Sequence, residues 1–180
     1  DEIVPVEIAA RKGKSVVVTT DQHPRNDLTV EDMASLPPVF KENGTVHAGN
    51  SSGVTDGGAA VLVMSEDAAE RHGVNVMAHV IAATQAGIAP SVMGMGPVPA
   101  MRQLMELLRI GIADIDLIEL NEAFAAQVLA VDQELQLDQE KLNVNGGAIA
   151  LGHPIGCTGT RILVTLVREM VRRGAKRGVA

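Results

Sequence analysis

Short apolar runs alternate with segments of helical spacing from residue 59 onward. The runs are typical of buried strands and predict strands at residues 59–64, 76–83, 116–120 and 141–144. Helices are expected between and after them, at residues 65–73, 99–110, 122–135 and 157–173. This alternation predicts an α/β architecture with helices covering a sheet, and it leaves open whether the strands pair in parallel or mixed fashion.

Residues 1–55 lack this rhythm. A short strand is expected at residues 16–20 and a helix at residues 29–36, because Thr29 and Asp32 have nearly the spacing of a capping box. Two consecutive prolines end the helix, and a glycine-rich connection follows. We expect this part to be an excursion from the α/β unit and not a core.

Both ends of the chain indicate a piece of a longer protein. The first residue is Asp1, and no apolar targeting segment follows it. Near the other end, Gly174 follows a basic helix end and predicts a helix stop, after which a strand barely begins before Ala180. We therefore expect the chain to be a fragment.

The composition excludes several classes of function. The chain has 180 residues, with 15 Lys and Arg against 22 Asp and Glu, which gives a formal charge of −7 and argues against a nucleic-acid partner. Phe40 and Phe124 are the only aromatic residues, which excludes base stacking and aromatic cages as main functions. Because Cys157 is the only cysteine, neither an intramolecular disulfide nor a cysteine-rich zinc site is expected. A reducing compartment fits, either the cytoplasm or, in a eukaryote, an organellar matrix.

The longest uncharged stretch, residues 73–101, contains several polar side chains and three prolines that lipid-facing positions would not tolerate. We expect a soluble chain with no membrane partner. No metal is expected either, because the histidines outside the glycine-rich loop show no ligand spacing: His23, His47, His72 and His79.

The glycine-rich loop at residues 143–157 is the most informative segment. Gly147 and Gly152 have the spacing of a phosphate-binding loop, but His153 stands where that loop needs a lysine. A second glycine pair, at residues 94–96, lacks the third glycine of a dinucleotide-binding fingerprint. Both nucleotide-binding interpretations are therefore rejected.

Two polar residues at predicted loop positions are candidates for chemistry. Glycines around His153 allow a substrate to approach the imidazole, and a histidine in such a loop suits a general base or hydrogen-bond donor. The alternative is a histidine that only satisfies its own loop. Asn121 lies at a strand-to-helix junction, where it is either a simple N-cap or a site residue. Glu122 suits the first helical turn, and Phe124 is compatible with a core position.

Two further features have simpler explanations. Cys157 lies near a helix start and four residues after His153, but Pro154 and Gly156 disfavour the helical connection that a Cys-His pair needs. A buried small thiol is the preferred interpretation. Residues 48–60 could offer donors to a polar ligand, although a turn-rich entry into a strand explains them as well.

Several segments, in this order, resemble the thiolase family of acetyl-CoA C-acetyltransferases and 3-ketoacyl-CoA thiolases: residues 48–60, 92–100, 121–124 and 143–159. The resemblance covers essentially the whole chain. It implies a layered αβαβα fold with a mixed sheet that is incomplete in this chain. It also implies the end of a loop domain on the CoA-binding side, the last strand and helix of the N-terminal domain, and most of the C-terminal domain without its final strands, at residues 1–55, 56–75 and 76–180.

The activity implied by the resemblance is acyl transfer between acyl-CoA and CoA by a ping-pong route, with Claisen condensation or thiolysis of a 3-ketoacyl-CoA. By the matching positions, His153 would activate a nucleophilic cysteine and would be one hydrogen-bond donor of an oxyanion hole. Asn121 would hold the water that is the second donor of that hole.

The resemblance further implies a CoA-binding surface, with CoA as a substrate and no tightly bound cofactor. Ser52 would contact the pantetheine arm and Arg25 the nucleotide end. Phe40, Met93 and Phe124 would line the channel between them.

Both catalytic cysteines of the family fall outside this match. The nucleophile is expected in a preceding segment and the acid/base cysteine just beyond Ala180, and Cys157 matches neither. The chain alone is therefore expected to lack turnover, while the full enzyme would be a dimer or tetramer. The alternative is a non-catalytic CoA-binding or assembly module that complements a cysteine-bearing chain. A β-ketoacyl synthase relative fits the loop around His153 less well.

Overall fold

The computed structural model describes residues 3–9, 13 and 15–180, so Asp1 lies outside the described residues. The architecture is mixed α/β, as predicted, with one antiparallel strand pair, one parallel strand pair and the surrounding helices. None of the helices in these ranges is long and apolar enough to cross a membrane.

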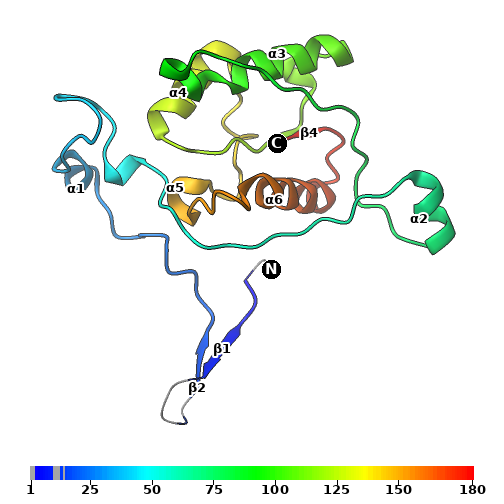
Figure 1. Cartoon of the computed structure of the whole chain (residues 1–180), viewed down its shortest axis with the longest axis horizontal. Helices are drawn as coiled ribbons and strands as arrows, with labels where there is room; N and C mark the ends of the chain where they lie inside the picture. Colours follow the sequence, from blue (N-terminus) through cyan, green and yellow to red (C-terminus); the bar gives the residue numbers. More distant parts are fainter. Residues whose placement is uncertain (1–2, 10–12, 14) are drawn as a thin grey trace.

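The first element is an antiparallel hairpin of β1 (Val6–Ala9) and β2 (Ser15–Val18). Val6 pairs with Val18 at its base, and the apolar side chains of both strands are exposed except for the half-buried Val18. Figure 1 shows the hairpin reaching away from the helices. The strand expected at residues 16–20 is confirmed, although it ends at Val18.

Helix α1 (Val30–Ala34) confirms the helix expected at residues 29–36 and its capping box. The backbone N–H of Asp32 donates to the Thr29 hydroxyl at 3.1 Å, and the backbone N–H of Thr29 donates to the Asp32 carboxylate at 3.0 Å. The helix is short because Ser35 already forms its C-cap.

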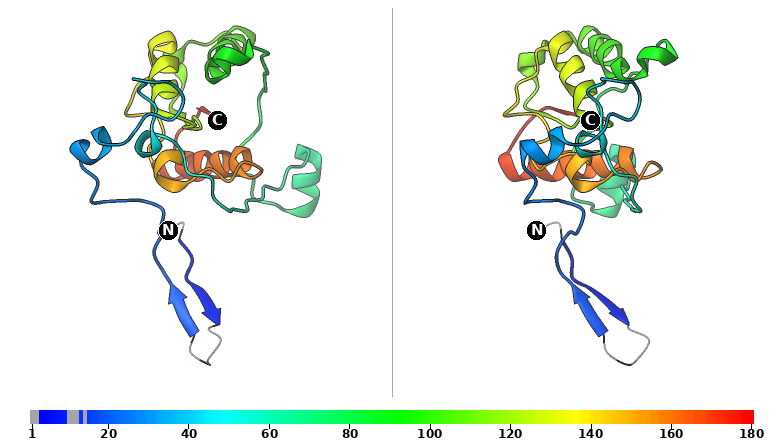
Figure 2. Two further views of the ribbon diagram at one scale, coloured as in Figure 1. Left: turned by 60° about the vertical axis from the view of Figure 1, so that its left-hand side comes forward. Right: turned by 90° about the vertical axis from the view of Figure 1, so that its left-hand side faces the viewer.

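The core surrounds a parallel strand pair, β3 (Leu117–Ile118) and β4 (Gly178–Val179). Helices α3 (Pro97–Leu108) and α4 (Ala125–Leu135) lie on one side of the pair, and α6 (Thr158–Arg173) lies on the other (Figures 1 and 2). Parallel strands need a long crossover connection, and here the chain from β3 to β4 passes through α4, α5 and α6.

The apolar cluster between β3 and the helices α3 and α4 contains the two largest fully buried side chains, Ile115 and Val131. The other buried members of the cluster are Val98, Ile118, Leu135, Leu137 and Leu142. Leu166 of α6 is also buried, next to β4. Aliphatic packing replaces aromatic packing here, as the composition requires.

Two helices confirm their predicted ends. Helix α2 (Glu66–His72) begins after Ser65, whose hydroxyl accepts from the N–H of Ala68, and ends at Gly73 in the left-handed conformation with φ of +61°. Helix α6 ends in the same way at Gly174, with φ of +65°. The strand expected just after this helix stop is β4.

Two other helices differ from their predicted bounds. Helix α3 begins at Pro97 and ends with Arg109, instead of Gly111, in the left-handed conformation. Helix α4 begins only at Ala125, so Asn121 is not its N-cap and Glu122 does not lie in its first turn. Ala123 and Phe124 are not helical because they pair with a distant segment, Ser51 and Ser52.

Three predicted strands are wrong or reduced. Residues 59–64 and 76–83 form no strand; Leu62 and Val80 are 81% and 76% exposed. A strand needs a partner edge, and the described chain supplies none for these segments. The strand expected at residues 141–144 is reduced to one parallel bridge between Ile118 and Leu142.

The remaining helical turns lie in connections. Helix α5 (Ala148–Leu151) interrupts the glycine-rich loop that was expected to be irregular. Short 3₁₀ turns occupy η1 (Ala48–Asn50), η2 (Pro90–Met95) and η3 (Ile112–Asp114).

Candidate functional site

His153 lies between α5 and α6, in a segment that is held by residues from the first third of the chain. Its backbone N–H donates to the carbonyl of Gly53 at 2.8 Å, and it forms a parallel bridge with Val54. Its side-chain Nδ1 lies 2.8 Å from the hydroxyl oxygen of Thr158 in the first turn of α6. The imidazole is therefore fixed by long-range pairing on one side and by a helix on the other.

The residues that lead into α4 are held by the same distant segment. Ser51 forms an antiparallel bridge with Phe124, and the N–H of Ser52 donates to the carbonyl of Ala123 at 3.1 Å. The Ser52 hydroxyl lies 3.3 Å from the same carbonyl. This pairing holds Phe124 in extended backbone, with φ of −148° and ψ of 144°, which explains why α4 starts late.

Residues 51–54 thus join two motifs that are far apart in the sequence. Their first half pairs with the segment that carries Asn121, and their second half pairs with His153. Within the described part of the chain, no hydrogen bond joins the side chains of Asn121 and His153 directly. Residues 51–54 are the backbone segment that links the two motifs.

The side chain of Asn121 has an unpaired acceptor. Its Oδ1 is buried and has no hydrogen-bond partner among the described residues. A buried carbonyl oxygen without a partner is costly, and a bound water or a ligand donor is the usual remedy. This observation agrees with a water-binding role for Asn121 and not with a cap.

Glu122 has a larger role than its place in the sequence indicates. Its carboxylate accepts from the side chain of Asn143 and from the N–H of Ile149, each at 3.1 Å. A Cβ added to Gly147 would overlap the carboxyl group of Glu122, so only glycine allows this approach. Gly147 does indicate a close anionic neighbour, but that neighbour is Glu122 and not a phosphate.

The residues expected to bind CoA are only partly brought together. The rings of Phe40 and Phe124 meet edge to face, with centroids 5.4 Å apart and an interplanar angle of 87°. Ser52 is half-buried beside Ala123. Met93 lies in η2, which packs against α4, and its side chain is 76% exposed.

Arg25 is exposed, and no hydrogen bond or ion pair of the described residues joins it to this group. Phe40 is 73% exposed despite its contact with Phe124. The exposed ring of Phe40 and the half-buried ring of Phe124 form an open surface, able to take an extended ligand but not to enclose it.

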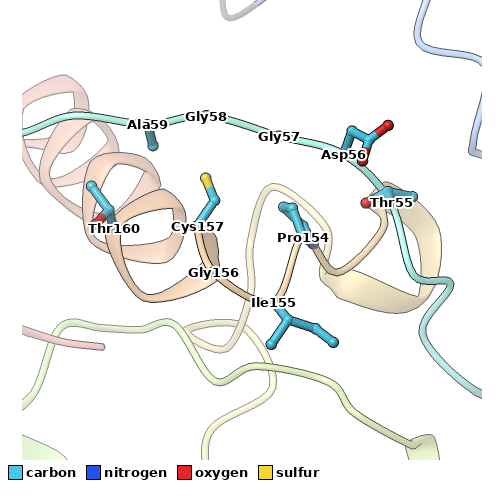
Figure 3. A pocket seen from close by; sticks show the side chains of 10 residues that line it. All are labelled: Thr55, Asp56, Gly57, Gly58, Ala59, Pro154, Ile155, Gly156, Cys157 and Thr160. Carbon is cyan, nitrogen blue, oxygen red and sulfur yellow. The ribbon is translucent and has the colours of Figure 1, made fainter.

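Cys157 belongs to a different hollow. A cavity of about 370 Å³ lies between residues 55–59 and the start of α6, and Figure 3 shows Cys157 and Thr160 beside it. Neither His153 nor Asn121 lines this cavity. Cys157 is half-buried, not buried as expected, and the imidazole of His153 pairs with Thr158 instead.

Comparison with known proteins assigns the chain to a family. Residues 74–180 match the thiolase C-terminal domain, and residues 1–67 match the thiolase N-terminal domain. The chain belongs to the thiolase family.

Individual thiolases support the assignment. The acetyl-CoA acetyltransferase of Syntrophomonas wolfei is 55% identical over the whole of this chain. The crystal structure of the Bacillus anthracis acetyl-CoA acetyltransferase superimposes on 98% of the chain with a TM-score of 0.91 and 50% identity. A structure of human mitochondrial 3-ketoacyl-CoA thiolase in complex with CoA covers 88% of the chain, with a TM-score of 0.79 and 45% identity.

The match covers most of this chain but only part of each relative. The chain covers 46% of the Syntrophomonas thiolase, 45% of the Bacillus structure and 40% of the human structure. It therefore spans less than half the length of the thiolases to which it is similar.

Proposed function

We propose that this chain supplies the oxyanion-binding and CoA-binding part of a thiolase that transfers acyl groups between acyl-CoA and CoA. The observation that carries the proposal is the pairing of residues 51–54 with both Ala123 and His153. Through this pairing, residues 51–54 connect three of the thiolase-like segments: residues 48–60, 121–124 and 143–159. The similarity to a human thiolase in complex with CoA supports the substrate class.

In the proposed reaction, a cysteine thiolate from outside residues 1–180 attacks the thioester carbonyl. The carbonyl oxygen becomes negative, and the imidazole of His153 and a water on the free Oδ1 of Asn121 donate hydrogen bonds to it. The same imidazole accepts the thiol proton before the attack. The carbonyl then re-forms, the bond to the CoA sulfur breaks, and the departing CoA takes the proton from the imidazole, which leaves the acyl group on the cysteine. The second cysteine removes an α-proton from the second thioester, whose carbanion attacks the acyl-cysteine and releases the cysteine thiolate in a Claisen condensation. In the reverse direction, CoA cleaves a 3-ketoacyl-CoA.

We further propose that CoA lies along the Phe40 and Phe124 ring pair, with Ser52 near the pantetheine arm. Met93 would complete the channel from η2, and Arg25 would meet the nucleotide end. The exposed ring of Phe40 against the half-buried ring of Phe124 fits a surface that an extended ligand covers. CoA is a substrate in this proposal, and no tightly bound cofactor is required.

The full enzyme would have the layered αβαβα fold and assemble as a dimer or tetramer. Residues 1–55, 56–75 and 76–180 would belong to its loop domain, N-terminal domain and C-terminal domain. The unpaired segments at residues 59–64 and 76–83 fit strands whose neighbours lie outside the chain.

The test is complementation. The 180-residue chain is mixed with the N-terminal portion of a related thiolase and a peptide carrying the C-terminal cysteine stretch, and thiolysis of acetoacetyl-CoA is followed. Turnover that needs all parts supports the proposal. His153→Gln and Asn121→Ala should each lower kcat by roughly 10²–10³, whereas His72→Gln, on the exposed surface of α2, should not. Equal activity of all three variants would contradict it.

The alternative is a CoA-binding or assembly module without turnover of its own. Its signature is tight binding of CoA by the chain alone, with no thiolysis in any mixture. An acyl carrier substrate used in preference to acetyl-CoA would instead indicate β-ketoacyl synthase chemistry.

A further inference from the structure

The ring of His153 has a hydrogen-bond partner, Thr158, that plays no part in the proposed reaction. Nδ1 lies 2.8 Å from Thr158 Oγ1, and the Thr158 hydroxyl donates to the carbonyl of Pro154 at 3.0 Å. Thr158 is 4% exposed, so water does not compete for its hydroxyl. The hydroxyl carries one proton, and the direction in which that proton points decides which imidazole nitrogen is protonated.

Counting hydrogen bonds separates the two arrangements. If Nδ1 is protonated, it donates to Thr158 Oγ1 while the hydroxyl donates to the Pro154 carbonyl, and two bonds form in a chain. If Nε2 is protonated, the hydroxyl must turn to Nδ1, and the bond to Pro154 is lost. The first arrangement has one more buried hydrogen bond, and its two bonds polarise each other.

We propose that Thr158 is a positioning residue that holds neutral His153 in the Nδ1–H tautomer. Nε2 then keeps its lone pair on the side of the ring away from α6. The additional buried hydrogen bond favours the Nδ1–H form over the Nε2–H form, which predominates when nothing holds Nδ1.

The catalytic meaning of this tautomer rests on the proposed function. Nε2 accepts the proton of the cysteine thiol, the S–H bond breaks, and the sulfur electron pair attacks the thioester carbonyl. The new Nε2–H then donates to the oxygen that has become negative, while Nδ1–H remains on Thr158. One hydroxyl thus prepares the imidazole for both of its proposed roles.

The tautomer is measured on the 180-residue chain by two-bond proton–nitrogen correlation of the histidine rings in mildly alkaline buffer. The chain contains its own references. Nδ1 of His47 accepts from the N–H of Gly49 at 3.2 Å, which requires the Nε2–H form. Nδ1 of His23 lies 2.7 Å from the carbonyl of Ala150, which requires the Nδ1–H form. The signals of His153 are those lost in His153→Gln.

The expected result is a His153 pattern like that of His23. Thr158→Val, which removes the hydroxyl at nearly constant volume, should convert it to the pattern of His47, and Thr158→Ser should retain the original. Thr160→Val removes a hydroxyl from the same helix and should change nothing. An Nε2–H pattern in the unsubstituted chain overturns the proposal, as does an unchanged pattern in Thr158→Val. If that variant loses its helical circular dichroism, the unsubstituted spectrum and Thr158→Ser decide.

The complemented enzyme provides an independent measurement. Thr158→Val should lower kcat roughly 10- to 100-fold with little change in KM, and Thr158→Ser should restore it. An Nδ1–H pattern without thiolysis in any mixture would contradict the proposed function and leave the tautomer assignment intact. Thiolysis together with an Nε2–H pattern would support the proposed function and contradict the tautomer assignment.

Discussion

Gly152 holds the backbone before His153 in a conformation that other residues avoid. Its φ is +96°, and an added Cβ would lie 2.5 Å from both Oγ1 and Cγ2 of Thr55, so rotation of the Thr55 side chain does not relieve the overlap. Gly152→Ala should therefore destabilise the chain by about 1–3 kcal/mol. Urea unfolding followed by circular dichroism measures the change.

The matched control is Gly156→Ala in the same loop. An added Cβ there meets nothing within 4 Å, and its φ lies outside the left-handed region. A small or favourable change is expected, since alanine reduces the freedom of the unfolded chain. Equal losses in the two variants would mean that the backbone around His153 is not constrained as described.

Some residue positions could be interpreted from the sequence, and others could not. The candidate role of His153 stays a prediction from its glycine-rich loop, whereas the close approach of Glu122 to Gly147 was not predicted. The role of Asn121 as a cap was wrong, and Glu122 was misplaced, because neither is decided locally. The start of α4 depends on the pairing of Ala123 and Phe124 with residues 51–52, and Glu122 contacts loop residues more than twenty positions away along the chain.

Helices were predicted better than strands for a related reason. A helix end is fixed by its own residues, as at Ser65 and Gly73 of α2. A strand exists only beside another strand, and the apolar runs at residues 59–64 and 76–83 have no neighbour in the described chain. Their apolar pattern is real, but the element that it predicts needs a partner edge.

The C-terminal half of α6 depends on a buried carboxylate. Hydrogen bonds from Arg172, together with those from Asn145 and Arg173, lower the pKa of Glu169 from 4.5 to about 2 against the opposing effect of burial. Because the folded pKa is lower than the unfolded one, the stabilisation is complete above about pH 4.5. It is lost as the pH falls from there towards about 2.

Glu169→Gln should consequently be less stable than the unsubstituted chain at neutral pH and nearly equal to it at the acid end of this window. Urea midpoints measured across the window test the expectation. Glu106→Gln in α3, an exposed carboxylate on a helix of similar length, should leave the acid profile unchanged. A constant difference at every pH would show that Glu169 acts by packing and not by its charge.

At the scale of the whole molecule, the proposed site and the exposed apolar segments at residues 59–64 and 76–83 both fit part of a larger thiolase fold. The site unites segments through residues 51–54, while the family match accounts for less than half of each related thiolase. The sequence could predict the family and the order of its motifs, because motifs are local. It could not predict how few of the expected strands form, since a strand needs a pairing partner and the described residues supply none for residues 59–64 and 76–83.

The exposed apolar segments should make the isolated chain associate with itself. Leu62 and Val63 are 81% and 72% exposed, and Val80 and Ile81 are 76% and 73% exposed, in extended backbone with free hydrogen-bonding groups. Such edges pair with other chains. Light scattering after size exclusion should give masses above the 18.8 kDa of the monomer, and the chain should bind an environment-sensitive apolar dye.

Replacing Leu62 and Ile81 together by lysine should shift the chain towards the monomer and weaken dye binding without reducing its helical signal, because charges on an edge oppose strand addition. Val171→Lys is the control: this side chain is 56% exposed on α6, and the substitution adds positive charge without changing either segment. If Val171→Lys disperses the chain equally well, net charge and not the two apolar segments governs association. A monomeric, dye-free chain before any substitution would mean that these segments are covered in solution.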